Sequence, residues 1–310
     1  MKTLIFGYFD LNFGDDWLIH QFCHLYKKEN VILVVSDDKL FSPYKNHKKY
    51  TSIKNVGKLK SLIQSDEIYI IGGSMFQQGS NWITHYSKLY LFISIASLLR
   101  KKTYIYGCNI TPPKSKYFKF LISRIFKHTD HFLVRDYTSK KTLINEYHIL
   151  NKHIELNLDL ADKNTLSLSL KKSNQCAVSI INNSQIDEKN YFTWLKNKIL
   201  DIQKNNINIV FNLFSFDCGR ESDNSAIKKF TQYLHTENIN INYTIYLYDG
   251  DIYKFINRWQ ICKIAICTRF HSYILARNSN QSYSIYGYSD KIRTYIETHH
   301  PQDLPFLYVP

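Results

Sequence analysis

The stretch Ala265-Ile266-Cys267-Thr268-Arg269-Phe270-His271-Ser272-Tyr273 decides how the rest of the chain is interpreted. Residues 263–267 form a short apolar run typical of a buried strand, and residues 270–277 have a helical pattern. Residues 268–271 are therefore expected at the carboxyl end of a strand. In open α/β sheets, ligands bind at these ends.

Arg269 and His271 carry the chemistry of this stretch. A guanidinium is planar, always charged and suited to a carboxylate or a phosphate, and an imidazole can give or accept a proton near neutral pH. The pair therefore indicates an acidic substrate. The alternative is that Arg269 pairs with a structural carboxylate and that His271 caps the helix.

Apolar runs alternate with amphipathic stretches along all 310 residues, which predicts two α/β domains with parallel sheets. The polar segment 161–174 is the predicted linker, so the domains are expected at residues 1–165 and 173–310. The strands are predicted at residues 3–8, 31–36, 67–71, 103–106, 131–134 and 154–160, and then at 176–181, 207–214, 243–246, 263–267 and 283–286.

The composition limits the classes of partner that the chain is expected to bind. A net charge of +14 favours phosphate-bearing ligands, nucleic acid or an anionic membrane surface, but no RNA-binding signature is present, so nucleic acid is not expected. The N-terminus has no signal segment, and the longest apolar stretch, 89–99, is too short to span a membrane, which predicts a core helix in a cytoplasmic protein.

Cysteine and histidine spacing predicts no metal site. The six cysteines form no CxxC pair and are expected to be reduced and buried. His20 and His24 lie one helical turn apart but have no third ligand nearby in the sequence.

Three other predicted strand ends also carry polar residues or glycines. After the first strand, one of Asp15 and Asp16 is expected to cap a helix, while the other carboxylate could orient or deprotonate a hydroxyl. Gly72-Gly73-Ser74 follows another strand, where glycines let the backbone approach a ligand. Arg135 follows a third strand and is a second candidate for binding an anion. No GxGxxG or Walker loop indicates a nucleotide cofactor.

The order of these motifs resembles that of the polysaccharide pyruvyltransferase family. The resemblance extends from Gly7 to Lys291. It rests on Asn12-Phe13-Gly14-Asp15-Asp16, Gly72-Gly73, Tyr106-Gly107 with Pro112-Pro113, Val134-Arg135-Asp136 with Ser139, Arg269-Phe270-His271, and Tyr286 with Lys291.

The resemblance implies an enzyme that moves an enolpyruvyl unit from phosphoenolpyruvate to a sugar of a cell-surface polysaccharide or exopolysaccharide, where it forms a pyruvate ketal. It also implies a GT-B-like fold, with two Rossmann-like domains facing across a cleft, the N-terminal one on the acceptor side and the C-terminal one on the donor side. Phosphoenolpyruvate would then be the donor substrate, and neither a cofactor nor a metal would be required.

The resemblance also implies roles for individual residues. His271 would protonate the donor, Asp15 or Asp16 would activate a hydroxyl of the acceptor, and Arg135 and Arg269 would hold the carboxylate and phosphate of the donor. The remaining substrate-binding residues would be Asn12, Gly72, Gly73, Ser74, Asn109, Tyr286 and Lys291. The chain departs from the family at Ser74, where a third glycine is usual, and at residues 108–113, so the acceptor sugar is left open.

Two alternatives are kept beside this hypothesis. A GT-B glycosyltransferase that uses a nucleotide sugar would also place basic residues at strand ends, and a non-catalytic sugar-binding protein could have the same fold. The expected partners of the pyruvyltransferase are phosphoenolpyruvate and a sugar or a lipid-linked oligosaccharide.

A basic and apolar segment, 114–127, bears on location. If it is helical, one stripe could pack on the sheet, whereas Tyr117 and Phe120 lie off that stripe. The residues of the stripe are Phe118, Leu121, Ile122, Ile125 and Phe126. Apolar residues among cations are what a peripheral helix uses to rest on an anionic membrane surface. The protein is therefore expected in the cytoplasm, and at the inner face of the membrane if this helix rests there.

Overall fold

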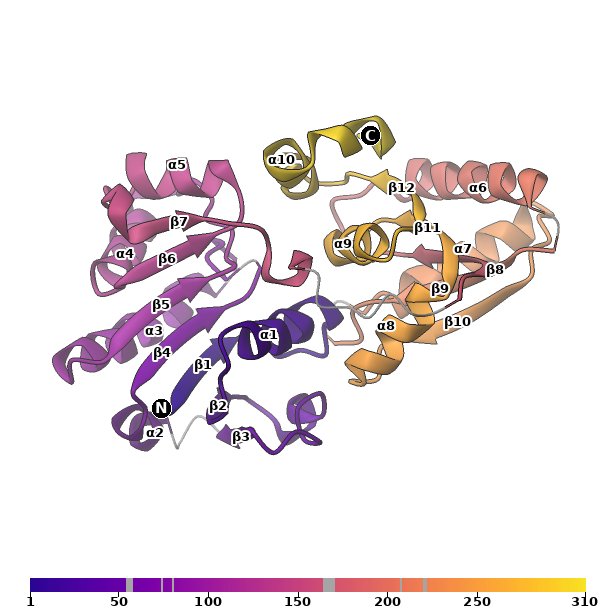
Figure 1. The fold of residues 1–310 in the computed structure, drawn as a ribbon. Helices are drawn as coiled ribbons and strands as arrows, with labels where there is room; N and C mark the ends of the chain where they lie inside the picture. The colour runs from indigo at the N-terminus through magenta and orange to yellow at the C-terminus, as the bar shows by residue number, and fades with distance from the viewer. Residues whose placement is uncertain (54–57, 74, 80, 164–170, 207, 220–221) are drawn as a thin grey trace. The chain divides into compact units, whose positions relative to one another are not determined.

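The chain folds into two α/β units, each built on a parallel sheet (Figure 1). The computed structural model describes residues 1–53, 58–73, 75–79, 81–163, 171–206, 208–219 and 222–310. The first unit comprises Met1–Phe9 and Asp15–Lys163, and the second comprises Asp10–Gly14 and Asn164–Pro310. The sequence analysis had assigned all of residues 1–165 to one domain, whereas the structure groups residues 10–14 with the second unit.

The first unit has a seven-stranded sheet in the order β3-β2-β1-β4-β5-β6-β7. The strand order reverses between β1 and β4, so the switch point of the sheet, where α/β folds bind ligands, lies between these two strands. The strands are β1 (Thr3–Gly7), β2 (Val31–Val34), β3 (Tyr50–Ile53), β4 (Glu67–Ile71), β5 (Lys102–Tyr106), β6 (His131–Val134) and β7 (Ile154–Leu156). The helices are α1 (Phe13–Leu25), η1 (Asp38–Phe41), α2 (Lys58–Gln64), α3 (Trp82–Leu98), α4 (Lys116–Lys127), α5 (Tyr137–Asn145), η3 (Asn151–His153) and η4 (Leu160–Asp162).

The second unit has a six-stranded sheet in the order β10-β9-β8-β11-β12-β13. Its switch point lies between β8 and β11. The strands are β8 (Ser173–Ser179), β9 (Val210–Ser215), β10 (Tyr243–Leu247), β11 (Cys262–Cys267), β12 (Ser282–Tyr286) and β13 (Leu307–Tyr308). The helices are α6 (Glu188–Asn205), α7 (Asn224–Thr236), α8 (Ile252–Gln260), α9 (Phe270–Asn278), α10 (Asp290–His299) and η5 (Pro301–Phe306).

Each unit encloses its own hydrophobic core. Ile70 of β4 lies in the core of the first unit, and Leu213 of β9 lies in that of the second. The strands that contribute most are rich in isoleucine, valine and leucine, which pack well when both faces of a parallel sheet are covered by helices. The six cysteines are free thiols, and all but the half-buried Cys218 are buried.

The predicted fold class is confirmed, and two predicted strands, 67–71 and 131–134, have the observed bounds. Other predictions were displaced by a few residues: the strand predicted at 154–160 ends at Leu156, and β8 begins at Ser173, inside the predicted linker. Residues 164–170 of that linker lie outside the described residues. The short elements β3, α2 and β13 were missed.

The stretch 89–99 is helical, as predicted, and Ile93 and Ala96 belong to the core, but only one side of the helix is buried there. It belongs to α3, which begins earlier, at Trp82, and buries only Tyr86, Ile93 and Ala96 among its described residues. Because α3 lies on the outside of the first sheet, one side of this apolar helix faces solvent. The helix α4 is confirmed: its predicted stripe is buried except for the half-buried Leu121, while Tyr117 and Phe120 are exposed. None of the described helices is long and apolar enough to span a bilayer.

Candidate active site

Each unit has a polar network at the carboxyl edge of its sheet, next to the switch point. In the first unit, β1 is followed by α1 and β4 by Gly72 and Gly73. Gly73 N–H donates a hydrogen bond to Asp15 Oδ1 (3.2 Å), which joins the two loops at the switch point. Gly72 has a φ of +154°, and a Cβ there would lie 2.9 Å from Met75 Cγ, so this position requires glycine.

Arg135 extends this network to the ends of β5 and β6. Its Nη1 donates to Asp159 Oδ2 (2.5 Å), and its Nε donates to Asn109 Oδ1 (3.1 Å). Its Nη2 also bonds to Asn109 Oδ1 and to Gly73 O. The side chain of Arg135 is 1% exposed and that of Asp159 is fully buried. The pair therefore fixes the loops around Gly73.

Asn109 connects Arg135 to the start of α5. Its Nδ2 donates to Asp136 Oδ2 (2.6 Å). Asp136 caps α5, because its Oδ1 accepts a hydrogen bond from Ser139 N–H (2.7 Å). Ser139 Oγ in turn accepts from Ile110 N–H (2.9 Å). The turns after β5 and β6 are thereby held together.

The structure separates the two tandem aspartates. Asp16 is buried and accepts a hydrogen bond from the hydroxyl of Tyr44 (2.7 Å), so it ties α1 to the segment after η1. Asp15 is only partly buried. Of the two carboxylates, that of Asp15 is therefore the more accessible.

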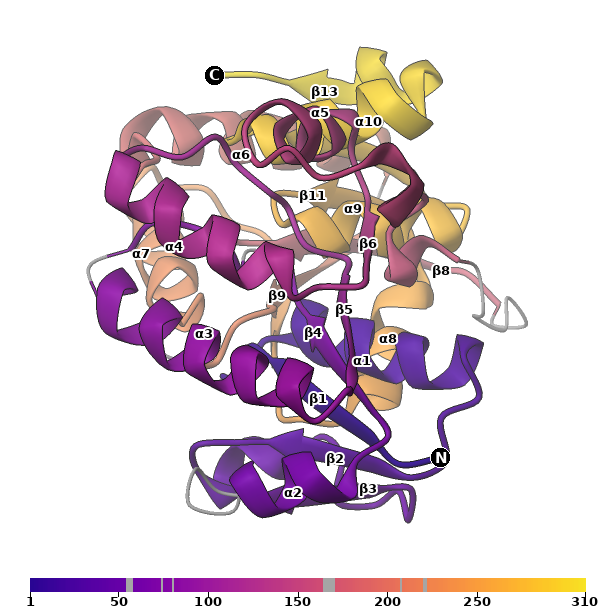
Figure 2. The ribbon, with the colours of Figure 1, turned by 90° about the vertical axis from the view of Figure 1, so that its left-hand side faces the viewer.

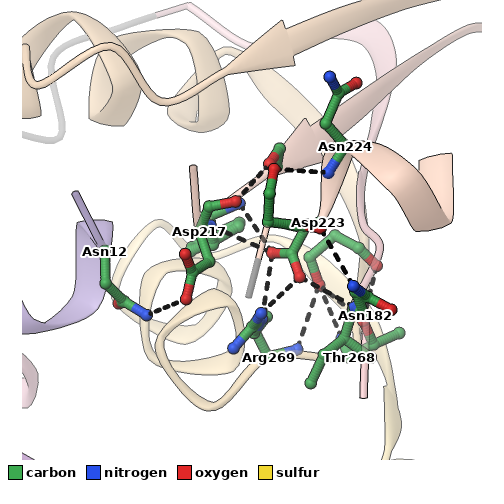
Figure 3. A network of polar contacts seen from close by, with 12 residues as sticks. Asn12, Asn182, Asp217, Asp223, Asn224, Thr268 and Arg269 are labelled. Atoms are coloured by element: carbon green, nitrogen blue, oxygen red, sulfur yellow. Dashed lines mark hydrogen bonds and ion pairs between the residues drawn. The ribbon is translucent and has the colours of Figure 1, made fainter. Parts of the chain in front are cut away.

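In the second unit, residues 11–13 lie antiparallel to residues 216–218, beyond the end of β9. Phe13 N–H donates to Phe216 O (2.8 Å), and Cys218 N–H donates to Leu11 O (3.1 Å). Asn12 completes this bridge: its Nδ2 donates to Asp217 Oδ2 (3.0 Å), while its Oδ1 accepts from Gly14 N–H (3.0 Å) (Figure 3). Asn12 therefore has a structural task within this unit.

Arg269 pairs with Asp223, the residue before α7. In Figure 3 the guanidinium points directly at the carboxylate. Arg269 Nε donates to Asp223 Oδ2 (3.1 Å), and Nη2 bonds to Asp223 Oδ1. The same carboxylate accepts hydrogen bonds from the N–H groups of Asn182, Phe216 and Asp217. Arg269 therefore does pair with a structural carboxylate, as the alternative in the sequence analysis proposed. Its side chain is nevertheless 15% exposed.

This ion pair has electrostatic consequences for both partners. Burial alone would lower the pKa of Arg269, but the neighbouring Asp223 carboxylate more than reverses this, and the pKa of Arg269 is raised. Burial raises the pKa of Asp223, and the charge of Arg269 opposes that rise. The guanidinium is therefore a fixed positive charge at the edge of the sheet.

Hydroxyl groups hold the turn between β11 and α9. Ser179 Oγ, at the end of β8, accepts from Thr268 N–H (2.7 Å) and donates to Ser272 Oγ (2.8 Å). Ser272 Oγ also accepts from Arg269 N–H (3.2 Å), and Tyr191 donates to Thr268 Oγ1 (3.1 Å). The backbone that carries Arg269 and His271 is thus fixed from β8 and α6.

His271 lies in the first turn of α9, and its ring packs against the backbone of Gly14. The side chain is buried, and a Cβ added at Gly14 would lie 1.9 Å from His271 Nδ1. No side chain other than hydrogen fits at Gly14 without moving the imidazole. The glycine of the Asn12-Phe13-Gly14 motif is therefore required by a histidine that lies more than 250 residues later in the sequence.

The remaining predicted site residues lie elsewhere in the second unit or outside the described part. Tyr286 is buried, with its ring beside those of Tyr191, Trp194 and Tyr308. Lys291 Nζ lies 5.0 Å from the ring centroid of Phe270, the neighbour of His271. Ser74 lies outside the described residues. Across the described ranges, no group of three or more His, Cys, Asp or Glu is arranged to hold a metal ion.

Several of the predicted site residues therefore belong to the polar network of one unit or the other. Asp15, Gly72, Gly73, Asn109 and Arg135 cluster in the first unit. Asn12 and Arg269 belong to one polar network in the second, and His271 lies at the start of the same helix that Arg269 precedes.

The sequence analysis missed three carboxylates: Asp159, Asp217 and Asp223. Asp159 and Asp223 form ion pairs with Arg135 and Arg269, and Asp217 accepts a hydrogen bond from Asn12. The only local signal was the position of Asp223 just before a helical pattern, which is typical of a helix cap. Nothing local pairs Asp223 with Arg269, because they are 46 positions apart.

Comparison with solved structures supports the fold. HepE of Anabaena, solved in complex with UDP and glucose, has a TM-score of 0.59 and 11% identity over 93% of this chain and 81% of that one. The UDP-GlcNAc 2-epimerase of Methanocaldococcus jannaschii has a TM-score of 0.57 and 12% identity over 100% and 89%. A glycosyltransferase of Rickettsia africae has a TM-score of 0.53 and 11% identity over 92% and 79%. At these identities the similarity concerns the GT-B-like fold alone.

Comparison with protein families is more specific. No curated protein matches the chain. A family model described as polysaccharide pyruvyl transferase matches residues 12–280, from Asn12 in the first motif to just beyond the end of α9. Because this match spans most of the 310 residues, the chain belongs to the polysaccharide pyruvyl transferase family, a family of transferases that act on polysaccharides.

Proposed function

We propose that this transferase moves a pyruvyl unit from phosphoenolpyruvate to a sugar of a cell-surface polysaccharide and closes it into a cyclic ketal. Membership of the family is the observation that carries this proposal. It is supported by a fixed positive charge, Arg269, two residues before His271 at the start of α9. A donor with both a carboxylate and a phosphate matches that chemistry.

Arg269 has donor capacity left for such an anion. Its hydrogen bonds to Asp223 use Nε and Nη2, which leaves Nη1 to bind the donor. Asp223 fixes the guanidinium before the donor arrives, so little reorganisation is needed at the moment of reaction. We assign Arg269 to the carboxylate or phosphate of phosphoenolpyruvate, and Lys291, beside Phe270, to the same anion.

His271 is assigned as the proton donor. Protonation of the methylene carbon of phosphoenolpyruvate turns it into a methyl group and makes the second carbon electrophilic. A sugar hydroxyl then attacks that carbon, and the phosphate leaves with the electron pair of its C–O bond. A second hydroxyl of the sugar attacks the same carbon, gives its proton to the released phosphate and closes the ketal. The net products are the ketal and inorganic phosphate, so atoms and protons balance.

Asp15 is assigned as the base that takes the proton of the attacking hydroxyl, since Asp16 is buried against Tyr44. Gly72, Gly73 and Asn109 belong to the same network as Asp15 and are assigned to the acceptor. The acceptor is a sugar or a lipid-linked oligosaccharide in exopolysaccharide synthesis. Nucleic acid has no place in this reaction.

The proposal is tested by a donor screen on the purified protein. Phosphoenolpyruvate at about 100 times its Kd should stabilise the fold by about 2.7 kcal/mol and raise the melting temperature, whereas UDP-sugars should not. Incubation with phosphoenolpyruvate and an acceptor glycan should release phosphate and add a ketal, detected by mass spectrometry. Stabilisation by a UDP-sugar, with glycosyl transfer in place of phosphate release, would instead identify a glycosyltransferase, the other activity that this fold supports.

A further inference from the structure

The outward face of α3 and α4 combines exposed apolar side chains with basic ones. The two helices pack side by side on one face of the first sheet (Figure 2). The ring of Phe118 in α4 contacts those of Trp82 and Tyr86 near the start of α3. The outward sides of the helices therefore form one continuous surface, here named the α3–α4 face.

Large apolar side chains point away from the sheet on both helices. Leu91 and Leu98 of α3 are 63% and 83% exposed, and they lie seven residues apart, on the same side of the helix. Tyr117 and Phe120 of α4 are 82% and 60% exposed. None of the four is needed to cover the core, because each helix buries other residues against the sheet.

The charge of this region is entirely positive in the sequence. No Asp or Glu occurs in the 62 residues from 68 to 129, a run that contains nine Lys and Arg. The cations on or beside the two helices are Lys88, Arg100, Lys114, Lys116, Lys119, Arg124 and Lys127.

Local contacts refine which cations are available to a partner. Lys119 pairs with Glu146 (2.9 Å), so its charge is already compensated. The Arg124 guanidinium lies 5.0 Å from the ring centroid of Phe120, so that a cation and an exposed aromatic ring form one unit on the surface. Lys116 and Lys127 lie at the two ends of α4 and are exposed.

We propose that the α3–α4 face is a docking surface for a bilayer rich in anionic lipid. Exposed apolar side chains enter the boundary between headgroups and acyl chains, and the surrounding lysines and arginines lie at the level of the anionic headgroups. The occupant follows from charge complementarity: the face offers cations and apolar groups together, and an anionic bilayer surface takes up both. A polyanion such as RNA would use the cations but would leave Leu91 and Leu98 exposed.

The docking surface would bring the enzyme to membrane-attached glycans. It does not depend on the donor of the reaction, because it lies on helices rather than in the networks around Asp15 and Arg269. Loss of vesicle binding would therefore leave the proposed pyruvyl transfer untouched, and a failed donor screen would leave the docking surface untouched.

Co-sedimentation of the full chain with lipid vesicles tests this proposal. The protein should pellet with vesicles of phosphatidylcholine mixed with phosphatidylglycerol, and it should stay in solution with phosphatidylcholine alone. The double variant Lys116→Glu, Lys127→Glu should weaken binding at least about tenfold, because each cation near an anionic surface contributes about one kcal/mol. The matched control Lys204→Glu, Lys228→Glu changes the net charge equally but alters exposed lysines of the second unit, and it should bind like the wild type.

A second pair of variants tests the apolar contribution. Leu91→Gln with Phe120→Gln should also weaken vesicle binding at least about tenfold, while Ile63→Gln with Tyr253→Gln, exposed apolar residues on α2 and α8, should not. Equal recovery in the supernatant with both vesicle types at low salt would overturn the proposal. Binding to a short RNA would also overturn it, if Lys116→Glu, Lys127→Glu abolished that binding and Leu91→Gln, Phe120→Gln did not. A dimer in solution that only Leu91→Gln, Phe120→Gln dissociates would overturn it as well.

Discussion

Arg135 and Arg269 differ in how much of the guanidinium a ligand can reach. Arg135 is 1% exposed, and its Nε, Nη1 and Nη2 all have partners in Asn109, Asp159 and Gly73. An anion there would have to compete with the buried Asp159. Arg269 is more exposed and keeps Nη1 outside its bonds to Asp223. Anion binding by Arg135 stays a prediction, and Arg269 is the stronger candidate.

Replacement of Arg269 by lysine should abolish most activity while the protein stays folded. Lysine keeps the charge but cannot bridge Asp223 and the donor with a planar fork. We expect kcat/KM for phosphoenolpyruvate to fall by about 100-fold or more, which corresponds to about 2.7 kcal/mol. Arg269→Ala should in addition destabilise the fold by about 3–5 kcal/mol, because it leaves the Asp223 carboxylate buried without its cation.

Steady-state kinetics and chemical denaturation measure these two effects separately. Asp223→Asn with Arg269 intact serves as the matched control for loss of the ion pair. Near-normal turnover in Arg269→Lys would remove the anion-binding role and leave Arg269 as a purely structural partner of Asp223.

Gly14→Ala should disable the enzyme through His271. The new methyl group would lie 1.9 Å from His271 Nδ1, so the imidazole has to move away from its position in the first turn of α9. Because a proton donor acts mainly in the transition state, we expect kcat to fall far more than the affinity for phosphoenolpyruvate, as in His271→Asn.

Gly79→Ala is the matched control, since a Cβ at Gly79 meets nothing within 4 Å. It should leave kcat unchanged. If Gly14→Ala and Gly79→Ala have the same kcat as the wild type while His271→Asn is inactive, the position of the imidazole does not depend on Gly14.

Candidate site residues could be named from the sequence, but their partners could not. Arg269, His271 and Asp15 became candidates because each follows an apolar run that ends where a helical pattern begins. Asp223 and Asp159 belong to loops with no such signal, and they meet the arginines only through strand pairing across the sheet. The contact between Gly14 and His271 likewise depends on residues 10–14 joining the second unit, which no local pattern indicates.

At the scale of elements, α1 begins with candidate site residues and continues with residues that pack against the rest of the unit. Its first turn carries Gly14 and Asp15, and one turn later His20 is buried against η1 and the segment after it. The His20 ring stacks on Tyr44, with 5.1 Å between the ring centroids, and its Nε2 lies 3.3 Å from Pro43 O. His20 therefore packs as a neutral aromatic ring rather than as a charged group.

Stability should fall as the pH drops below about 6.5 because of His20. Burial, with His47 nearby, lowers the pKa of His20 from 6.5 to about 3. Between these values the unfolded chain binds a proton at this residue and the folded protein does not, so the free energy of unfolding decreases as the pH falls. The slope from one such group is at most about 1.4 kcal/mol per pH unit.

Thermal unfolding between pH 5 and pH 7.5 measures this dependence, as those values bracket the unfolded pKa. His20→Gln should flatten the pH dependence, whereas His24→Gln, which changes the exposed histidine one turn later, should preserve it. An unchanged slope in His20→Gln would assign the pH dependence to other groups.

Elements were predictable where the apolar pattern was long or uninterrupted. After their first residues, Glu67 and His131, the strands 67–71 and 131–134 consist of apolar and aromatic residues without a break, and both were predicted with the observed bounds. The strand β3, Tyr-Thr-Ser-Ile, is half polar and lies at the edge of its sheet, so its pattern is too weak. For α3, hydrophobicity all around the helix indicated burial, but an apolar helix can also cover a sheet and keep an apolar outer side.

At the scale of the whole molecule, the chain consists of two units with separate cores. Backbone hydrogen bonds of each sheet stay within that sheet, and Ile70 and Leu213 are fully buried in different clusters. The Asp15 network belongs to the first sheet and the Arg269 network to the second. Damage to one core should therefore affect one network and spare the other.

Ile70→Ala and Leu213→Ala should each loosen one unit only. Removal of a fully buried isoleucine or leucine side chain costs about 2–5 kcal/mol, because it loses the transfer free energy of the deleted atoms and leaves a cavity.

Hydrogen exchange followed by mass spectrometry should show lost protection in β1, β4 and β5 for Ile70→Ala. For Leu213→Ala the loss should appear in β8, β9 and β11. Ile245→Ala, at a half-exposed position of the edge strand β10, should change little. Equal loss of protection in both sheets from either core variant would show that the two cores unfold as one cooperative unit, and the two networks would then have to be treated as one in every stability measurement.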